Sequence, residues 1–481
     1  MQPPDMWRVP PPSRPGGRFL VLSLAVAVLS FSMMQTLLVP ALPTFMGEFG
    51  IDAPLAGWIL TSYLLCGAVA APILGSLGDR YGHRKIMILT LAIFVVGSVL
   101  AAVAGSFAVL LFGRILQGAS TATFPLALAI VRRHLSGAPQ RAAFGWLSGT
   151  LGLGAGAALV IGGVVLEAAS WQVLFVIGAL MGGTALMLVV FFVPASSRGT
   201  VSRTDWVGTA LLVVGLVSLL LAISQGGSWG WVSLPVLGLF LLAVISLFAL
   251  VFVELRITTP LIDMRTLARP ALAVTNGLTL FLGFIPYIFY VGLPVLLQAP
   301  LASGNGHGFT VTETGLALLP GAILVFLGGR FAPLLILRIG AKSTAFLALA
   351  LMCIGSVGVA IAPGNLAMVV VFFSLVGLGN GVGFSVCADL VASLAPRDEV
   401  AAAMGVNGVL RTVGSALGAP IATVVLATVA VSEAGAATLP SFSMLFIVAA
   451  AVSALGAVLT LALRGESGGR EQGKNARGQG D

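Results

Sequence analysis

About fourteen apolar stretches of roughly 20 residues follow one another along this sequence, separated by short polar segments. A helix needs ~20 mostly apolar residues to cross the ~30 Å hydrocarbon core of a bilayer, so each stretch is long enough to span a membrane. Hydrophobic residues make up 58% of the chain and charged residues only 8%, whereas soluble domains carry about 25% charged residues. The composition therefore excludes a soluble fold and predicts an all-α membrane protein. The predicted spans are residues 19–42, 54–77, 86–104, 108–131, 142–166, 172–193, 206–224, 232–252, 271–298, 313–336, 343–362, 366–391, 401–429 and 440–463.

The first of these stretches could be mistaken for a signal peptide. Its apolar run is longer than the ~7–15 residues of a signal-peptide core, and no small-residue cleavage site follows it, so we expect a retained helix. Residues 1–17 and 464–481 are rich in Gly, Pro and charge and poor in apolar residues. We expect both segments to be disordered tails on the cytoplasmic side.

The positions of the basic residues predict the orientation of the chain. With the N-terminus placed inside, the 24 Lys and Arg fall either in cytoplasmic segments or within spans, and none falls in an outside loop. Those within spans are Arg114, Arg330 and Arg411. Because basic residues are retained on the cytoplasmic side, both termini are predicted to be cytoplasmic. The net charge of +8 thus reflects topology, and no nucleic-acid partner is expected. The abundance of Arg, Ala and Gly suggests a bacterial plasma membrane.

A weak internal repeat divides the chain into related halves. The segment GSLGDRYGHRK, which starts at Gly75, aligns with PLLILRIGAKS, which starts at Pro333, and the alignment places Gly82 opposite Gly340. We therefore expect two six-helix bundles, over residues 18–193 and 271–463, joined by a linker over 194–270 that carries two extra transmembrane helices. Repeated halves that meet at a cavity near the bilayer midplane are typical of transporters.

Two motifs identify a family. The loop predicted between the second and third spans has the pattern G-x-L-x-D-R-x-G-x-[RK], and the fourth span has the pattern R-x-x-Q-G. With these motifs the chain resembles the major facilitator superfamily, and in particular its drug:proton antiporters with fourteen spans. The loop motif consists of Gly75, Leu77, Asp79, Arg80, Gly82 and Arg84, and the second motif of Arg114, Gln117 and Gly118.

The resemblance implies the major facilitator fold and a role for each motif. The loop motif would form a gate that holds the two bundles together on the cytoplasmic side, with Asp79 facing the N-terminus of the helix that starts near Ala401. A carboxylate at a helix N-terminus is stabilised by ~0.3–1 kcal/mol. Arg114 would take part in proton coupling, together with Gln117 and Gly118. In the fifth span, the glycines that match the family's signature would act as a hinge; they are Gly154, Gly162 and Gly163.

Charged residues within the spans indicate the character of the substrate cavity. Arg411 is predicted near mid-depth, and Met34 stands where the family often has an aspartate. Asp389, about one turn from the inner end of its span, is the nearest acid and a possible proton site. We therefore expect a neutral to positive cavity, with Arg411 serving either in a structural pairing or in anion binding. The other polar residues predicted to line it are Gln35, Thr36, Asn276, Tyr287, Tyr290, Asn380 and Asn407.

The sequence thus predicts a secondary active transporter that exports small amphipathic molecules, such as antibiotics, by proton-coupled alternating access. The expected partners are the lipid bilayer, a small-molecule substrate and protons. We expect a monomer, without enzymatic activity, cofactor or metal. Two alternatives stay open, namely an exporter of one endogenous anionic metabolite and a membrane receptor or sensor that binds a ligand without moving it.

Overall fold

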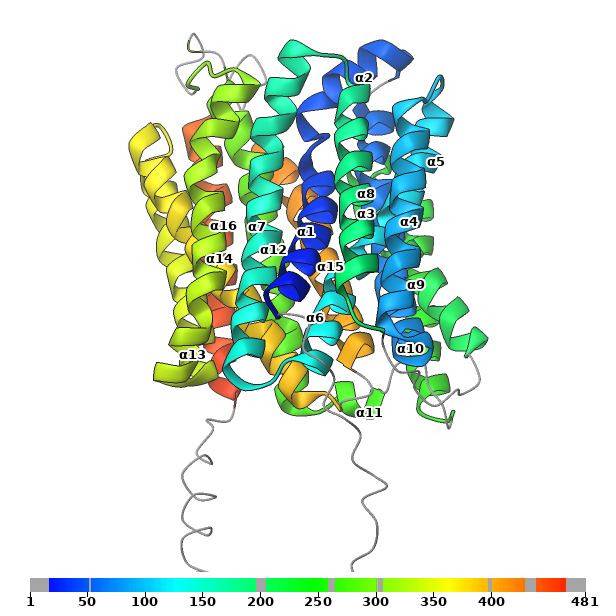
Figure 1. Ribbon diagram of the computed structural model, residues 1–481. Coiled ribbons are helices and arrows are strands. Elements are labelled where there is room, and N and C mark those ends of the chain that lie inside the picture. The colour runs from blue at the N-terminus through cyan, green and yellow to red at the C-terminus, as the bar shows by residue number, and fades with distance from the viewer. Residues whose placement is uncertain are drawn as a thin grey trace, which may run out of the picture.

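The computed structural model describes residues 17–51, 53–195, 205–257, 264–299, 301, 306–396, 400–428 and 438–463. Over these residues the chain forms α-helices and short 3-10 turns, as Figure 1 shows, which confirms the predicted all-α architecture. The first part of the chain contains α1 (Gly17–Thr36), η1 (Val39–Ala41), α2 (Leu42–Phe49), α3 (Ala53–Tyr81), α4 (His83–Ala102), α5 (Phe107–Gly118), η2 (Ala119–Ala122), α6 (Thr123–His134), α7 (Gly137–Ala168) and α8 (Gln172–Phe192).

The rest of the chain begins with a helical hairpin and continues with a second set of long helices. The hairpin consists of α9 (Trp206–Trp229) and α10 (Leu234–Glu254). The helices after it are α11 (Met264–Leu267), α12 (Pro270–Gln298), α13 (Val311–Ile361), α14 (Leu366–Leu394), α15 (Val400–Thr428), α16 (Leu439–Leu459) and η4 (Thr460–Ala462). Below, α1 to α8 are called the first half and α12 to α16 the second half.

Twelve helices in the described part of the chain are long and apolar enough to cross a membrane. One of them, α13, has 51 residues and covers both predicted spans 313–336 and 343–362. A straight helix of that length would measure about 75 Å, more than twice the hydrocarbon thickness. The backbone leaves the helical region at Gly340, where two helices meet at a kink. A further long helix, α15, lies over the predicted span 401–429 but is not among the twelve.

The glycines at the aligned positions of the internal repeat have the same backbone conformation. Gly82 has φ 101°, between α3 and α4, and Gly340 has φ 81°, at the kink in α13. Residues with a Cβ rarely adopt a positive φ, so glycine permits the sharp reversal at both places. The turn between α3 and α4 and the kink of α13 lie at the end of the bundle opposite α2, which Figure 1 draws at the top. The end with these two turns is called the Gly82 end, and the end with α2 is called the Gly50 end.

The halves meet along two pairs of helices, α7 with α13 and α3 with α15. Between α7 and α13, glycines bring the two backbones together. A Cβ added at Gly149 would lie 2.6 Å from the carbonyl oxygen of Phe326, and one at Gly145 would overlap the carbonyl oxygen of Gly329. Small residues allow helices to approach closely in lipid, where no hydrophobic effect drives them together.

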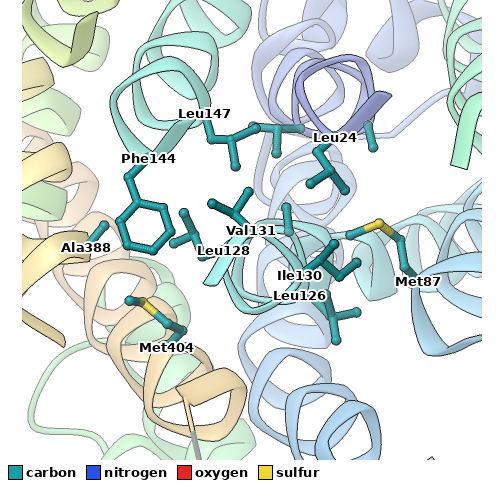
Figure 2. Packing of buried hydrophobic residues seen from close by; sticks show 14 of the residues in the cluster. Leu24, Met87, Leu126, Leu128, Ile130, Val131, Phe144, Leu147, Ala388 and Met404 are labelled. Atoms are coloured by element: carbon teal, nitrogen blue, oxygen red, sulfur yellow. The ribbon is translucent and has the colours of Figure 1, made fainter. Parts of the chain in front are cut away.

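An apolar cluster spans both halves at the Gly82 end (Figure 2). Leu128 of α6 and Phe144 of α7 belong to the first half, whereas Ala388 of α14 and Met404 of α15 belong to the second. Phe144 and Leu128 are fully buried in this cluster. The cluster closes the Gly82 end of the interface with side chains that have no polar atoms.

The hairpin of α9 and α10 packs on the outside of the junction between the halves. Leu212, Leu216 and Leu220 of α9 form a cluster with Ala68 of α3 and with residues of α15. The helix α10 packs on α9 and turns most of its apolar surface outward, with Leu241, Val244, Ile245 and Phe248 exposed, which suits a helix that faces lipid.

Candidate functional site: a central cavity between the halves

A cavity lies between the two halves, on the side of the apolar cluster that faces the Gly50 end. The first half contributes residues of α1 and α7, and the second half contributes residues of α12, α14 and α15. Small and aromatic residues form most of its wall, with a few polar side chains from both halves. The lining residues are Ser32, Gln35, Thr36, Leu151, Gly152, Ala155, Leu282, Gly283, Pro286, Tyr287, Tyr290, Asn380, Phe384, Arg411 and Ser415.

On the wall of the first half, the hydroxyl protons of α1 are directed to the backbone of α7. Ser32 Oγ donates to the carbonyl oxygen of Leu151, and Thr36 Oγ1 donates to that of Ala155 at 2.6 Å. Gly154 permits this close approach, because a Cβ there would lie 3.0 Å from Ser32. These two hydroxyls can therefore accept hydrogen bonds from a ligand, but their own protons are already in use.

A hydrogen bond joins the two walls. Gln35 Nε2 on α1 donates to the hydroxyl oxygen of Tyr287 on α12 at 2.8 Å. Tyr287 and Tyr290 lie about one turn apart on α12 and contact each other edge to face, with 5.9 Å between ring centroids. Pro286, next to Tyr287, lies inside α12 and lines the cavity as well. A proline inside a helix removes a backbone hydrogen bond and kinks the helix.

Arg411 is the cationic residue in the cavity lining. A close approach of α15 to α12 positions it, because Gly283 lies against the backbone carbonyl of Arg411 and leaves no room for a Cβ. The same carbonyl oxygen accepts a hydrogen bond from Ser415 Oγ at 3.0 Å. The guanidinium carbon lies 5.9 Å from the centroid of the Phe384 ring on α14. Tyr287 and Tyr63 are its electrostatic neighbours as well, and no carboxylate of the described residues lines the cavity beside it.

The acids of the described helices lie outside the cavity. Asp389 is half-buried in the last turns of α14, toward the Gly82 end, and is not among the lining residues. Glu167 and Glu313 lie at the Gly50 end of α7 and α13, and Asp79 at the Gly82 end of α3. The cavity wall formed by the described residues therefore carries a net positive charge.

The predicted asparagines separate into two places. Asn380 lines the cavity, and its Nδ2 donates to the carbonyl oxygen of Leu282 at 3.0 Å. Asn407 instead donates to Asn276 Oδ1 and to Thr279 Oγ1, both at 2.8 Å. This second group binds α15 to α12 within one half, nearer the Gly82 end, and does not line the cavity.

Arg114 is fully buried inside the first half, away from the cavity lining. Its Nε donates to the carbonyl oxygen of Ile59 at 2.8 Å, and its Nη1 donates to Gln117 Oε1 at 2.8 Å and to the carbonyl oxygen of Met34. The guanidinium also lies over the Tyr63 ring, 4.5 Å from its centroid. These contacts join α1, α3 and α5. Partial charges of backbone and amide oxygens thus stabilise the cation without a carboxylate.

The other members of the second motif continue this network. Gln117 Nε2 donates to Ser98 Oγ on α4 at 2.8 Å. Gly118 lies directly against the backbone of α3, since a Cβ there would be 2.6 Å from the carbonyl oxygen of Tyr63. The motif therefore connects four helices of the first half and sets the position of α5 against α3.

The predicted gate motif forms the turn between α3 and α4. Gly75, Leu77, Asp79 and Arg80 lie in the last turns of α3, Gly82 makes the reversal, and Arg84 lies in the first turn of α4. Arg84 Nη2 donates to the carbonyl oxygen of Val190 on α8 at 2.6 Å. That Asp79 faces the N-terminus of α15 stays a prediction.

A histidine adds a contact to this turn that the motif pattern did not indicate. His83 is buried, and its Nε2 lies 2.8 Å from Asp79 Oδ1, where the imidazole N–H donates to the carboxylate. Gly78 permits this arrangement, since a Cβ at that position would lie 3.2 Å from the His83 ring and 2.6 Å from Leu126.

The three predicted hinge glycines of α7 face different neighbours. Gly154 faces α1, and Gly162 faces the turn that follows α1, where a Cβ would lie 2.6 Å from the carbonyl oxygen of Leu37. Gly163 faces the second half, with a Cβ position 3.1 Å from Thr312 Oγ1 on α13. The same helix thus contacts its own half through two of these glycines and the opposite half through the third.

Two polar contacts between the halves were missed by sequence analysis. At the Gly82 end, Arg132 of α6 donates through Nη2 to the carbonyl oxygen of Ala395, at the C-cap of α14, at 3.2 Å. At the Gly50 end, Thr312 Oγ1 donates to Glu167 Oε1 at 2.8 Å. The only sequence signal was a polar residue at a helix end, which does not specify a partner more than a hundred residues away.

Comparison with known proteins assigns the family. The family model described as Major Facilitator Superfamily matches residues 24–419, with a second match over 278–480. The chain belongs to the major facilitator superfamily. This confirms the predicted family, and the chain is a multi-pass membrane transporter of that superfamily, not an enzyme.

Relatives of this major facilitator include named exporters. The tetracenomycin C resistance and export protein of Streptomyces glaucescens is 27% identical over 414 residues, covering 85% of this chain and 76% of its own length. Multidrug resistance protein 3 of Bacillus subtilis is 25% identical over 409 residues, covering 84% and 78%. Among solved structures, the proton:xylose symporter XylE superposes with a TM-score of 0.67 over 93% of this chain and 96% of its own, at 13% identity, which shows a shared fold.

Proposed function

We propose that this major facilitator exports small amphipathic molecules, including antibiotics, in exchange for protons that enter the cell. The observation that carries the proposal is the central cavity, because both halves contribute polar side chains to one space between them. A site between two halves can open to either side in turn when the halves rock against each other. The named resistance and export proteins among the relatives support export as the direction.

The proposed arrangement in the membrane has the Gly82 end in the cytoplasm of a bacterium, together with both termini. The kink at Gly340 divides α13 into two crossings, and α15 adds one more, so the twelve counted helices become fourteen crossings. Residues 18–193 and 271–463 would be the two six-helix bundles, and 194–270 the segment that carries α9 and α10. The protein would work as a monomer in the plasma membrane.

In the proposed cycle, the closed Gly82 end opens when the apolar cluster around Phe144 and Met404 separates and the contact of Arg132 with Ala395 breaks. The gate motif, with Asp79 held by His83, would stabilise the closed arrangement of that end. Gly154, Gly162 and Gly163 would allow α7 to bend or slide against its neighbours. Arg114, with Gln117 and Gly118, would link proton binding to the position of α5.

The proton carrier is proposed to be Asp389, because it is a half-buried carboxyl group on α14 between the cavity and the Gly82 end. Asp389→Asn should abolish transport driven by a pH gradient, while exchange of labelled for unlabelled substrate across the membrane should continue. Loss of both activities would show that Asp389 is needed for the fold or for substrate binding rather than for coupling.

Flux measurements test the proposed function directly. The purified full chain is reconstituted in liposomes, and a pH gradient is imposed in either direction. The probes are neutral chloramphenicol, cationic ethidium and anionic naphthoate. We expect accumulation of at least one probe on the acidic side and its release when a protonophore collapses the gradient. If no probe moves faster than in empty liposomes under any gradient, the transporter proposal is wrong and ligand binding without movement, as in a receptor, is favoured.

A further inference from the structure

Arg411 differs from Arg114, which is buried inside the first half, in how its charge is accommodated. The guanidinium of Arg114 has carbonyl and amide oxygens of three residues around it and an aromatic ring over it. The guanidinium of Arg411 lines the cavity, makes no side-chain hydrogen bond with the described residues, and lies 5.9 Å from the centroid of the Phe384 ring, with Tyr287 as an electrostatic neighbour. The protein thus surrounds the Nε and Nη1 of Arg114 with internal acceptors, whereas its Nη2 has none among the described residues, and Arg411 faces the space between the halves.

A charge in this position is costly unless something pairs with it. Arg411 lies about 16 Å along α15 from its start at Val400, so the side chain is near mid-depth and too far from either surface to snorkel. An arginine at the centre of a bilayer costs at least ~2.5 kcal/mol and is normally paired or exposed to a water-filled cavity. No acid of the described helices lines this cavity, so a bound anion would supply the complementary charge.

The remaining polar groups of the lining suit the same ligand. Tyr287 uses its oxygen as acceptor for Gln35, so its own O–H proton is available to a ligand, and Tyr290 makes no hydrogen bond with the described residues. Ser32, Thr36 and Ser415 direct their protons to backbone carbonyls. The donors left for a ligand are those of Arg411 and the tyrosines and the second N–H of the Gln35 and Asn380 amides. Among these, the guanidinium is the charged donor, and it matches the oxygens of a carboxylate.

We propose that the cavity binds small aromatic monoanions, with the carboxylate held by Arg411 and Tyr287 and the ring placed among Tyr287, Tyr290 and Phe384. The planar guanidinium binds a carboxylate through two parallel hydrogen bonds, which a lysine ammonium does not reproduce. Offset and edge-to-face contacts with aromatic side chains favour a flat, apolar body behind the acid. This inference rests on the proposed function and names the substrate class of the same cavity.

Equilibrium binding to the full chain in nanodiscs tests the inference without any gradient. Three probes of the same shape differ in charge: naphthoate, neutral naphthamide and cationic naphthylmethylammonium. We expect naphthoate to bind at least ~10-fold more tightly than naphthamide, which corresponds to about 1.4 kcal/mol, and the cation to bind most weakly. If naphthamide binds as tightly as naphthoate, or if naphthoate shows no saturable binding up to millimolar concentration, the inference is wrong.

Substitutions of Arg411 test whether its side chain holds the carboxylate. Arg411→Gln should weaken naphthoate at least ~10-fold and leave naphthamide unchanged, and Arg411→Lys should fall between wild type and Arg411→Gln. Arg330→Gln is the matched control, because Arg330 lies on α13 near the Trp146 ring and not in the cavity. Equal weakening of both probes by Arg411→Gln would show a structural role for the arginine and overturn the assignment. Elution profile and thermal midpoint of each variant establish that it is folded.

The outcome is separable from the test of the proposed function. Binding of naphthoate is measured at equilibrium, so it can succeed in a protein that fails to couple transport to protons. Conversely, gradient-driven movement of chloramphenicol or ethidium with no preference for naphthoate would uphold the exporter and reject the anion site.

Discussion

Gln35 on α1 donates a hydrogen bond to the hydroxyl of Tyr287 on α12, with 2.8 Å between the nitrogen and the oxygen. The two residues lie on the first long helix of each half, and their bond crosses the cavity. The bond therefore stabilises the arrangement described here, which we call closed. It has to break if the two walls move apart into an open arrangement.

The first prediction concerns this bond. Tyr287→Phe removes the acceptor, and loss of a neutral hydrogen bond costs ~1 kcal/mol, so the ratio of closed to open protein should fall about 5-fold. The distance between spin labels placed on the two halves reports this ratio. Tyr290→Phe is the control, because that hydroxyl has no hydrogen bond with the described residues and its removal should leave the distribution unchanged. Identical distributions for both variants and wild type would contradict the prediction.

A second prediction concerns the glycine contacts between α7 and α13. Gly149→Ala places a methyl group 2.6 Å from the Phe326 carbonyl oxygen, so the helices have to separate, and we expect a loss of ~1–3 kcal/mol in stability. Gly183→Ala on α8 meets no atom within 4 Å and should be neutral or slightly stabilising. Thermal unfolding of both variants in the same detergent gives the comparison. Equal midpoints would mean that the close approach contributes little to stability.

A third prediction compares the two buried arginines under the same substitution. Arg114→Gln leaves the carbonyls of Ile59 and Met34 without their donor, and we expect a loss of ~2–4 kcal/mol in stability. Arg411→Gln breaks no side-chain hydrogen bond within the described protein and removes a charge that is costly at this depth, so its stability should fall by less than ~1 kcal/mol or should rise. Denaturant or thermal unfolding separates the two. A larger loss for Arg411→Gln would indicate a structural role for that residue.

A fourth prediction follows from the charge of the proposed substrate. Each elementary charge that crosses the membrane contributes ~2.3 kcal/mol per 100 mV. For one proton entering per molecule exported, a neutral substrate moves one charge and a monoanion moves two charges in the same electrical direction. The logarithm of the naphthoate gradient should therefore depend about twice as steeply on membrane potential as that of chloramphenicol, in liposomes clamped with potassium and valinomycin. Equal slopes would exclude this stoichiometry for the anion.

A fifth prediction concerns orientation. The distribution of Lys and Arg places the C-terminus inside and the segment between α12 and α13 outside. A tag fused at Asp481 should be protected in intact cells, whereas a tag inserted at Asn305 should be accessible to a membrane-impermeant reagent. If both tags are equally accessible, they lie on the same side of the membrane and an even number of crossings separates them. The prediction of two six-helix bundles would then be wrong.

The ends of the long helices were largely predictable from the sequence. The predicted span 271–298 corresponds to α12 (Pro270–Gln298), and 172–193 corresponds to α8 (Gln172–Phe192), because apolar runs bounded by polar or glycine-rich turns mark the bilayer surfaces. The alignment of Gly82 with Gly340 also anticipated two equivalent reversals of the chain.

The faces of these helices were much harder to predict. Every face of a helix in lipid is apolar, so the sequence alone does not say which side of α15 meets the cavity. Asn407 and Arg411 are four residues apart, yet Asn407 bonds to Asn276 within the second half whereas Arg411 lines the cavity. The bond of Arg132 to Ala395 depends on how the two halves dock, which no local pattern encodes.

The position of α9 bears on how a solute can reach Arg411. Leu212, Leu216 and Leu220 lie over the line where α3 meets α15, so a molecule dissolved among the acyl chains meets a wall of leucine along that line. On the side of α7 and α13, the backbones touch at Gly145 and Gly149, which blocks the part of that line nearer the Gly82 end. In this conformation a lipophilic solute therefore meets packed side chains or backbone at both of these places, and its route to Arg411 has to avoid them.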